Sequence, residues 1–187
     1  MVPEVALVII NLVLVLLVAA AMVTDVRCRR IPNWQTVPAI GLGVVLNCMW
    51  AGQTGLLASL GGGIIGAGLL IIPYLLGGIG AGDVKLLAAI GALKGWPFVL
   101  WTAWYAALIG GLLGILILVK KRSVLRLLRY LLSLPLGCKV AALVPHRVQT
   151  ILGFAGEGTQ KSLSLSLPYG LAIALGTFGA LYLQYLH

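Results

Sequence analysis

The sequence contains only four acidic residues, and two of them stand where a carboxylate could take part in chemistry. Glu4 lies at the start and Glu157 in a glycine-rich loop, whereas Asp25 and Asp83 stand at the ends of long apolar segments. A carboxylate beside hydrocarbon is energetically expensive and calls for a reason. Two carboxylates held close together cannot both ionise easily, so one keeps a proton while the other accepts a proton from water. Asp25 and Asp83 therefore predict an aspartic dyad that hydrolyses a peptide bond.

A glycine-rich run, Gly-Gly-Ile-Gly-Ala-Gly, stands directly before Asp83. Glycine frees the backbone to turn and lets another chain approach closely. We expect Gly80 and Gly82 to bind the substrate by letting its extended backbone lie against Asp83. Each aspartate also has a structural alternative. Asp83 could be the N-cap of the helix that follows it, and Asp25 could be a solvated loop residue beside three arginines.

The composition predicts the kind of protein that would position these residues. Of 187 residues, 61% are hydrophobic and 9% are charged, whereas soluble domains have about 25% charged residues. The length suits about six transmembrane helices, because each needs about 20 residues. We therefore predict an all-α, polytopic membrane helix bundle in which residues 1–187 form one integral-membrane domain.

The apolar segments place the expected helices along the chain. The segment 24–35, which holds Asp25, is expected to be a short cytoplasmic turn, and residues 52–55 a tight outer turn. Gly62 and Gly66 have the spacing that lets membrane helices pack closely. The helix after Asp83 is short, so it should be tilted or buried within the protein. The expected spans are residues 5–23, 36–51, 56–76, 83–94, 98–119 and 167–186.

The formal net charge of +9 is distributed as in a membrane protein. The basic residues gather between apolar spans, and cytoplasmic loops carry such an excess. With the N-terminus outside, every lysine and arginine except Lys94 falls at the cytoplasmic side, and so do both aspartates. Residues 120–167 are expected to form a cytoplasmic loop that begins with an amphipathic helix on the inner membrane surface. No basic stripe with interleaved aromatic residues is present, which argues against nucleic acid as a partner.

Several short motifs resemble those of a known family. The string Gly-Ala-Gly-Asp-Val-Lys-Leu at residues 80–86 resembles the GxGD motif of the type IV prepilin peptidases, which are intramembrane aspartyl proteases. Asp25, followed six residues later by Ile-Pro-Asn at 31–33, resembles the same family, as does Pro-Tyr-Gly at 168–170. The resemblance implies that Asp25 and Asp83 are the catalytic residues. It also implies that the substrate is a type IV pilin-like precursor, whose basic leader is cut at the cytoplasmic face of the inner membrane.

The sequence also departs from the longer members of that family. Those members carry paired CxxC motifs and methylate the new pilin N-terminus, whereas the three cysteines here are far apart. The chain therefore resembles the short, peptidase-only forms that serve tight-adherence pili or archaeal preflagellins, and no cofactor is expected. A metal site built from Asp25, Cys28, Asp83 and His146 is an alternative, but no ligand pair has zinc-like spacing.

A non-enzymatic membrane protein is the alternative from another functional class. In a transporter or a pilus-assembly component, the glycine-rich run would be a broken-helix ligand site and Asp83 an ion ligand. Such transporters often contain an inverted repeat, and no second Gly-x-Gly-Asp occurs in the other half of this chain. The sequence thus favours the peptidase.

Overall fold

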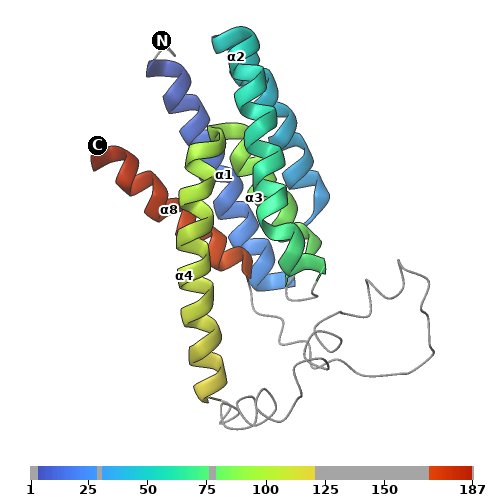
Figure 1. The fold of residues 1–187 in the computed structure, drawn as a ribbon, viewed down its shortest axis with the longest axis vertical. Coiled ribbons are helices and arrows are strands. Elements are labelled where there is room, and N and C mark those ends of the chain that lie inside the picture. Colours follow the sequence, from blue (N-terminus) through green and yellow to red (C-terminus); the bar gives the residue numbers. More distant parts are fainter. Residues whose placement is uncertain (1–3, 29–30, 76–78, 121–168, 187) are drawn as a thin grey trace, which may run out of the picture.

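The computed structural model describes residues 4–28, 31–75, 79–120 and 169–186. All regular secondary structure in these ranges is α-helical, as predicted from the composition (Figure 1). The helices are α1 (Glu4–Cys28), α2 (Asn33–Leu75), α3 (Ala81–Lys94), α4 (Trp96–Lys120) and α8 (Tyr169–Leu186). The predicted amphipathic helix and most of the expected loop at 120–167 lie outside the described residues.

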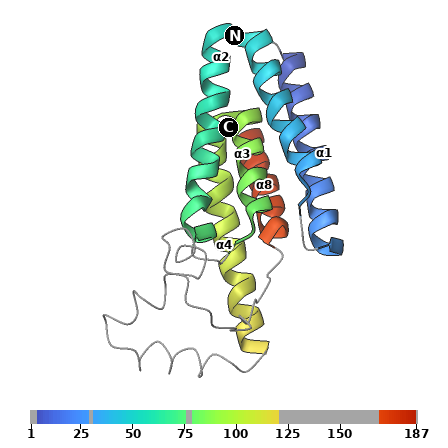
Figure 2. The same cartoon turned by 90° about the vertical axis from the view of Figure 1, so that its right-hand side faces the viewer.

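Helix α2 bends back on itself at Gly52. This residue has φ 59° and ψ −137°, a non-helical conformation that side chains other than glycine rarely adopt. The two halves of α2 lie side by side and run in opposite directions (Figures 1 and 2). The turn predicted at residues 52–55 is therefore confirmed, although it takes the form of a sharp break within one helix.

Four described helices are long and apolar enough to cross a membrane, namely α1, α2, α4 and α8. Helix α3 has 14 residues, which is about 21 Å at 1.5 Å per residue. That length falls short of the ~30 Å hydrocarbon core of a bilayer. The long apolar helices make this a membrane protein, and α3 is the short element enclosed by them, as the sequence analysis expected.

Helix α3 packs closely against α2 through glycine contacts and through side-chain hydrogen bonds to the end of α3. Gly62 of α2 meets Gly91 of α3 backbone to backbone, and Gly66 packs on Leu87. The packing role predicted for Gly62 and Gly66 is thus confirmed. At the end of α3, the carbonyl of Ala92 accepts hydrogen bonds from the side chains of Asn47 and Ser59. These bonds satisfy a carbonyl at a helix end that lies within the bundle.

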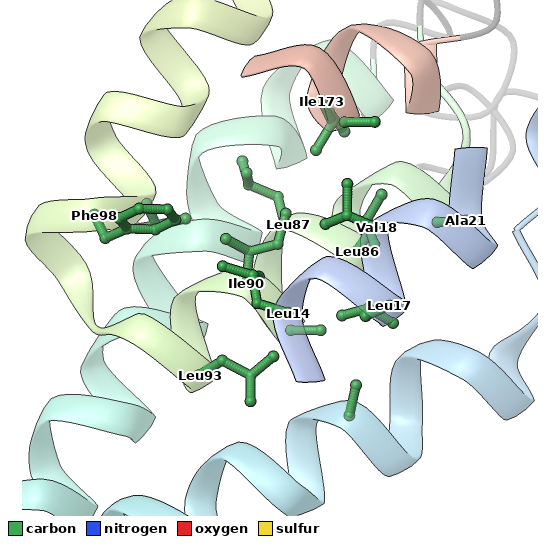
Figure 3. Close-up of a cluster of buried hydrophobic side chains, with 14 of the residues drawn as sticks. Leu14, Leu17, Val18, Ala21, Leu86, Leu87, Ile90, Leu93, Phe98 and Ile173 are labelled. Atoms are coloured by element: carbon green, nitrogen blue, oxygen red, sulfur yellow. The ribbon is translucent and has the colours of Figure 1, made fainter. Parts of the chain in front are cut away.

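The hydrophobic core surrounds α3 and ties the remaining helices to it (Figure 3). Leucine and isoleucine side chains of α3 meet α1 on one side, and α4 and α8 contribute further apolar groups. The largest of its fully or almost fully buried members are Leu14, Val18, Leu86, Leu87, Ile90, Leu93, Val99 and Ile173. Because α3 is held on several sides, its first turn has a fixed position relative to the ends of α1 and α8.

The segment predicted as a cytoplasmic turn at residues 24–35 is shorter than expected. Helix α1 continues to Cys28, and α2 already begins at Asn33. The Thr24 hydroxyl contacts the Gln35 side-chain oxygen at 3.3 Å across this connection. The apolar run ends at Val23, but the backbone hydrogen bonds of α1 continue to Cys28. Asp25 is consequently a helical residue rather than a loop residue.

Candidate active site

Asp25 lies in the last turn of α1 and is only 6% exposed. Its carboxylate packs against the first turn of α8: a Cβ on Gly170 would lie 2.7 Å from Asp25 Oδ2. Oδ2 has no hydrogen-bond partner among the described residues. The backbone N–H groups of Gly170 and Leu171, in the first turn of α8, stabilise the negative charge of the carboxylate. The interpretation of Asp25 as a solvated loop residue is therefore wrong.

Asp83 lies in the first turn of α3, at its third residue, and is 8% exposed. The alternative interpretation of Asp83 as the N-cap is wrong, because the N-cap is Gly80. The Gly80 backbone N–H donates a hydrogen bond to Asp83 Oδ2 at 3.1 Å, as in the second half of a capping box. Burial raises the pKa of Asp83 to about 6; the Gly80 N–H opposes this shift and the nearby Asp25 adds to it.

Both aspartates line one cavity of about 350 Å³, at the end of the bundle where α1 finishes and α3 begins. Its lining residues are Asp25, Ile31, Asn33, Gly80, Ala81, Gly82, Asp83 and Lys85. The four site residues expected from the sequence, Asp25, Gly80, Gly82 and Asp83, are thus brought together from segments more than fifty residues apart. A buried pair of like-charged groups in a cavity is the arrangement in which one proton is shared.

The two glycines of the site have different surroundings. A Cβ on Gly82 would lie 2.9 Å from Ile31 Cβ and 3.1 Å from the Ile31 carbonyl oxygen. A Cβ on Gly80 would meet the Asp83 carboxylate at 3.3 Å. Gly82 therefore allows the connection between α1 and α2 to pack on α3, in addition to lining the cavity.

Further residues at this site were not assigned from the sequence. Lys85 Nζ donates a hydrogen bond to Asn33 Oδ1 at 2.9 Å, which joins the first turn of α3 to the start of α2. Gly170 packs against the Asp25 carboxylate. Its neighbour Tyr169 is close enough to Asp83 for the two side chains to interact electrostatically. The only sequence signal for Gly170 was the Pro-Tyr-Gly string, which carries no information about its partner.

The donor set of the cavity does not resemble a metal centre. Among the described residues, which do not include His146, no group of three or more His, Cys, Asp or Glu side chains could hold a metal ion. Two carboxylates and one lysine instead suit proton transfer and the binding of polar backbone groups. The arrangement can activate a water molecule without a metal.

Comparison with known proteins identifies the family of this chain. The sequence profile of the type IV leader peptidase family matches residues 12–115, more than half of the chain. The matched range includes Asp25, Asp83 and the glycines between them. The chain therefore belongs to the type IV leader peptidase family, as its motifs predicted. No curated protein and no solved structure was found to match it.

Membership of this family implies a protease, which favours the peptidase over the transporter considered above. The match ends within α4, so it does not include α8. The contact between Gly170 and Asp25 is therefore known from the three-dimensional structure alone.

Proposed function

We propose that this protein is an aspartic endopeptidase that removes the basic leader peptide of type IV pilin-like precursors. Asp25 and Asp83 form its catalytic dyad, and no cofactor takes part. The observation that carries the proposal is the shared cavity: two of the chain's four acidic residues are both buried at its wall. Family membership supports the reaction class.

The surroundings of the two carboxylates support different roles for them. Asp25 faces the start of α8, where the helix dipole favours a negative charge. Asp83 is similarly buried but accepts a hydrogen bond from one backbone N–H, that of Gly80, and its pKa is raised to about 6 by burial, whereas two backbone N–H groups act on Asp25. We therefore assign the shared proton to Asp83 and the role of general base to Asp25.

The reaction follows from this division. Asp25 takes a proton from water as the water oxygen attacks the scissile carbonyl carbon, and Asp83 gives its proton to the carbonyl oxygen. The product of this step is a gem-diol. Asp25 then donates its proton to the amide nitrogen and Asp83 takes one from a hydroxyl group, so that the C–N bond breaks and the dyad returns to its starting state.

Cleavage at the cytoplasmic face of the inner membrane is part of the proposal. Arg27 and Lys85 lie at the end of the bundle that holds the aspartates, in agreement with the excess of basic residues on cytoplasmic sides. Gln53 lies at the opposite turn of α2. A variant with Cys28 as its only cysteine should be labelled from the cytoplasm, and Gln53→Cys on a cysteine-free background from outside. The reverse pattern would contradict this orientation.

The central experiment is cleavage of a purified pilin-like precursor by the purified protein in detergent or nanodiscs. Asp25→Asn and Asp83→Asn should each lower kcat/KM at least about a hundredfold, the usual range for losing a general acid or base. Membrane insertion should be unchanged, because asparagine has nearly the same shape as aspartate.

Glu4→Gln is the matched control, since Glu4 is exposed and lies in the first turn of α1, far along that helix from Asp25. It should cleave at the wild-type rate. If either aspartate variant kept more than a tenth of the wild-type kcat/KM, the dyad would be refuted. If wild-type protein cleaved the precursor only after added metal, the metal-free mechanism would fail.

A further inference from the structure

Lys94, the last residue of α3, carries a positive charge that has no anionic partner in the described part of the chain. Its Nζ donates a hydrogen bond to Asn11 Oδ1 at 2.8 Å and lies 5.1 Å from the centroid of the Phe98 ring. Both contacts are with uncharged groups. The acidic pair, Asp25 and Asp83, lies at the opposite end of α3.

The position of Lys94 along the bundle makes this charge unusual. Helices α1 and α2 extend beyond the end of α3, so the turn from α3 into α4 lies inside their ends on this side of the bundle (Figures 1 and 2). The side chains of Asn47 and Ser59 bond the final carbonyls of α3 within the bundle. A charged residue at such a depth in a membrane protein marks a functional site by default.

A cavity of about 460 Å³ opens beside Lys94, between the start of α4 and the C-terminal half of α8. In Figure 1, α8 runs obliquely across α4. The cavity is lined by Lys94, Pro97, Phe98, Trp101, Ala180, Leu183 and Gln184. Apart from Lys94 and Gln184 the lining is apolar or aromatic, and Trp101 is 55% exposed, so one side of the cavity faces the surrounding bilayer.

The lining of the cavity and the charge of Lys94 indicate which kind of ligand could bind there. It must be apolar along most of its length, reach the site from the bilayer, and carry a negative group at the level of Lys94. An ammonium has three donors, of which Asn11 takes one, so further donors are available to an anion. A free phosphate ion would satisfy the charge but would leave the apolar lining uncovered.

We propose that this cavity is a binding site for an anionic phospholipid from the half of the bilayer opposite the aspartates. Its phosphate pairs with the Lys94 ammonium and the Gln184 amide, and its acyl chain lies along Phe98, Trp101 and Leu183. The proposal does not depend on the peptidase activity, because the two cavities lie at opposite ends of α3.

The test is native mass spectrometry of the detergent-purified protein titrated with phosphatidylglycerol and with phosphatidylcholine of identical acyl chains. The wild type should bind phosphatidylglycerol at least about tenfold more tightly, which corresponds to about 1.4 kcal/mol. Lys94→Met should reduce this preference to less than about twofold, because it removes the charge and keeps an unbranched side chain only one atom shorter. Lys94→Arg should retain the preference.

Lys85→Met is the matched control, since it removes a lysine from the same helix that is also hydrogen-bonded to an asparagine. It should keep the preference for phosphatidylglycerol. A second variant, Leu183→Trp, fills the cavity without changing any charge and should weaken the binding of phosphatidylglycerol. Thermal unfolding of each variant in detergent should give a single transition, which identifies the folded preparations used for titration.

Three results would overturn the proposal. The first is an unchanged lipid preference in Lys94→Met. The second is an equal loss of preference in Lys85→Met, which would indicate diffuse attraction to a basic protein. The third is displacement of phosphatidylglycerol by millimolar inorganic phosphate, which would indicate an anion site that does not recognise the lipid.

Discussion

The two ends of α3 each bury an ionisable residue, but they are built in different ways. At its start, Asp83 is joined by a second carboxylate, Asp25, in a cavity made from α1, the α1–α2 connection and α3. At its end, Lys94 has uncharged contacts beside an apolar cavity. Two like charges in one polar cavity exchange protons, whereas one isolated charge in an apolar cavity attracts an opposite charge. The start of α3 is therefore suited to proton transfer, and its end is suited to binding an anion.

The largest effect expected away from the aspartates themselves is that of Gly170→Ala. The added Cβ would lie 2.7 Å from Asp25 Oδ2 and 3.0 Å from its Cγ, so the carboxylate must move. A displacement of about 1 Å at a catalytic group lowers the rate roughly a hundredfold. We expect kcat for precursor cleavage to fall by about that factor with KM little changed, and the phosphatidylglycerol preference at Lys94 to stay the same.

The matched control for this substitution is Gly179→Ala on the same helix. Its Cβ would make ordinary contact with the Tyr105 ring at 3.6 Å, so cleavage should stay within about twofold of the wild type. If Gly170→Ala also cleaved at the wild-type rate, α8 would have no part in positioning Asp25. The site at the start of α3 would then be formed by α1 and α3 without a contribution from α8.

A second large effect is expected for Gly82→Val. Its Cβ would lie 2.9 Å from Ile31 Cβ and 3.1 Å from the Ile31 carbonyl oxygen. Overpacking of this kind costs about 1–3 kcal/mol, and it would shift the first turn of α3 with Asp83. We expect both the cleavage rate and the thermal stability in detergent to fall.

Gly68→Val carries the same change to a position where the added Cβ has no contact within 4 Å beyond the backbone of its own helix, and it should have little effect on either quantity. Lost cleavage with unchanged stability in Gly82→Val would contradict the packing account. That result would instead assign Gly82 to direct contact with the substrate backbone.

These contacts show where the sequence was informative and where it was not. The apolar runs located the helices, because burial and helix length follow from composition. Asp25 and Asp83 stood out because acids are so few. The contact of Asp25 with Gly170 joins residues far apart in the chain, and no local pattern encodes such a contact.

Two local details were also missed for physical reasons. Asp25 was expected in a loop because hydrophobicity ends at Val23, yet the backbone hydrogen bonds of α1 continue to Cys28. The alternative considered for Asp83 was the N-cap, but Gly80 takes that position and the Asp83 carboxylate accepts a hydrogen bond from its N–H. Which residue becomes the N-cap depends on the backbone dihedral angles at the helix start, and several neighbouring residues could adopt those angles.

A moderate effect is expected from pH. Asp83 must hold a proton to act as the general acid, and its pKa is raised to about 6 mainly by burial. The kcat/KM for cleavage should therefore fall by up to tenfold per pH unit above about pH 6. The measurement is a cleavage series across pH 5–9 in buffers of constant ionic strength. A rate that stayed flat from pH 6 to pH 9 would exclude Asp83 as the acid. Lys94→Met should show the same profile as the wild type, because its charge lies at the other end of α3.

The smallest effect expected concerns the stability cost of the buried carboxylate. The pKa of Asp83 rises from 3.8 to about 6 on folding, so the folded state binds a proton more readily than the unfolded state. By linkage, stability falls as the pH rises through the window from about 4 to about 6, and the penalty is complete above it.

Asp83→Asn removes this penalty and keeps an oxygen that can accept the Gly80 N–H. We therefore expect the variant to be more stable than the wild type at pH 8, by about 1–3 kcal/mol, although it does not cleave. The gain should shrink as the pH falls from 6 towards 4 and disappear below that, as measured by thermal unfolding in detergent. Lys94→Met should show no such change between pH 4 and 6, because a lysine does not titrate there. If Asp83→Asn were less stable than the wild type at pH 8, the Asp83 carboxylate would contribute to folding, and its burial would need a structural rather than a catalytic explanation.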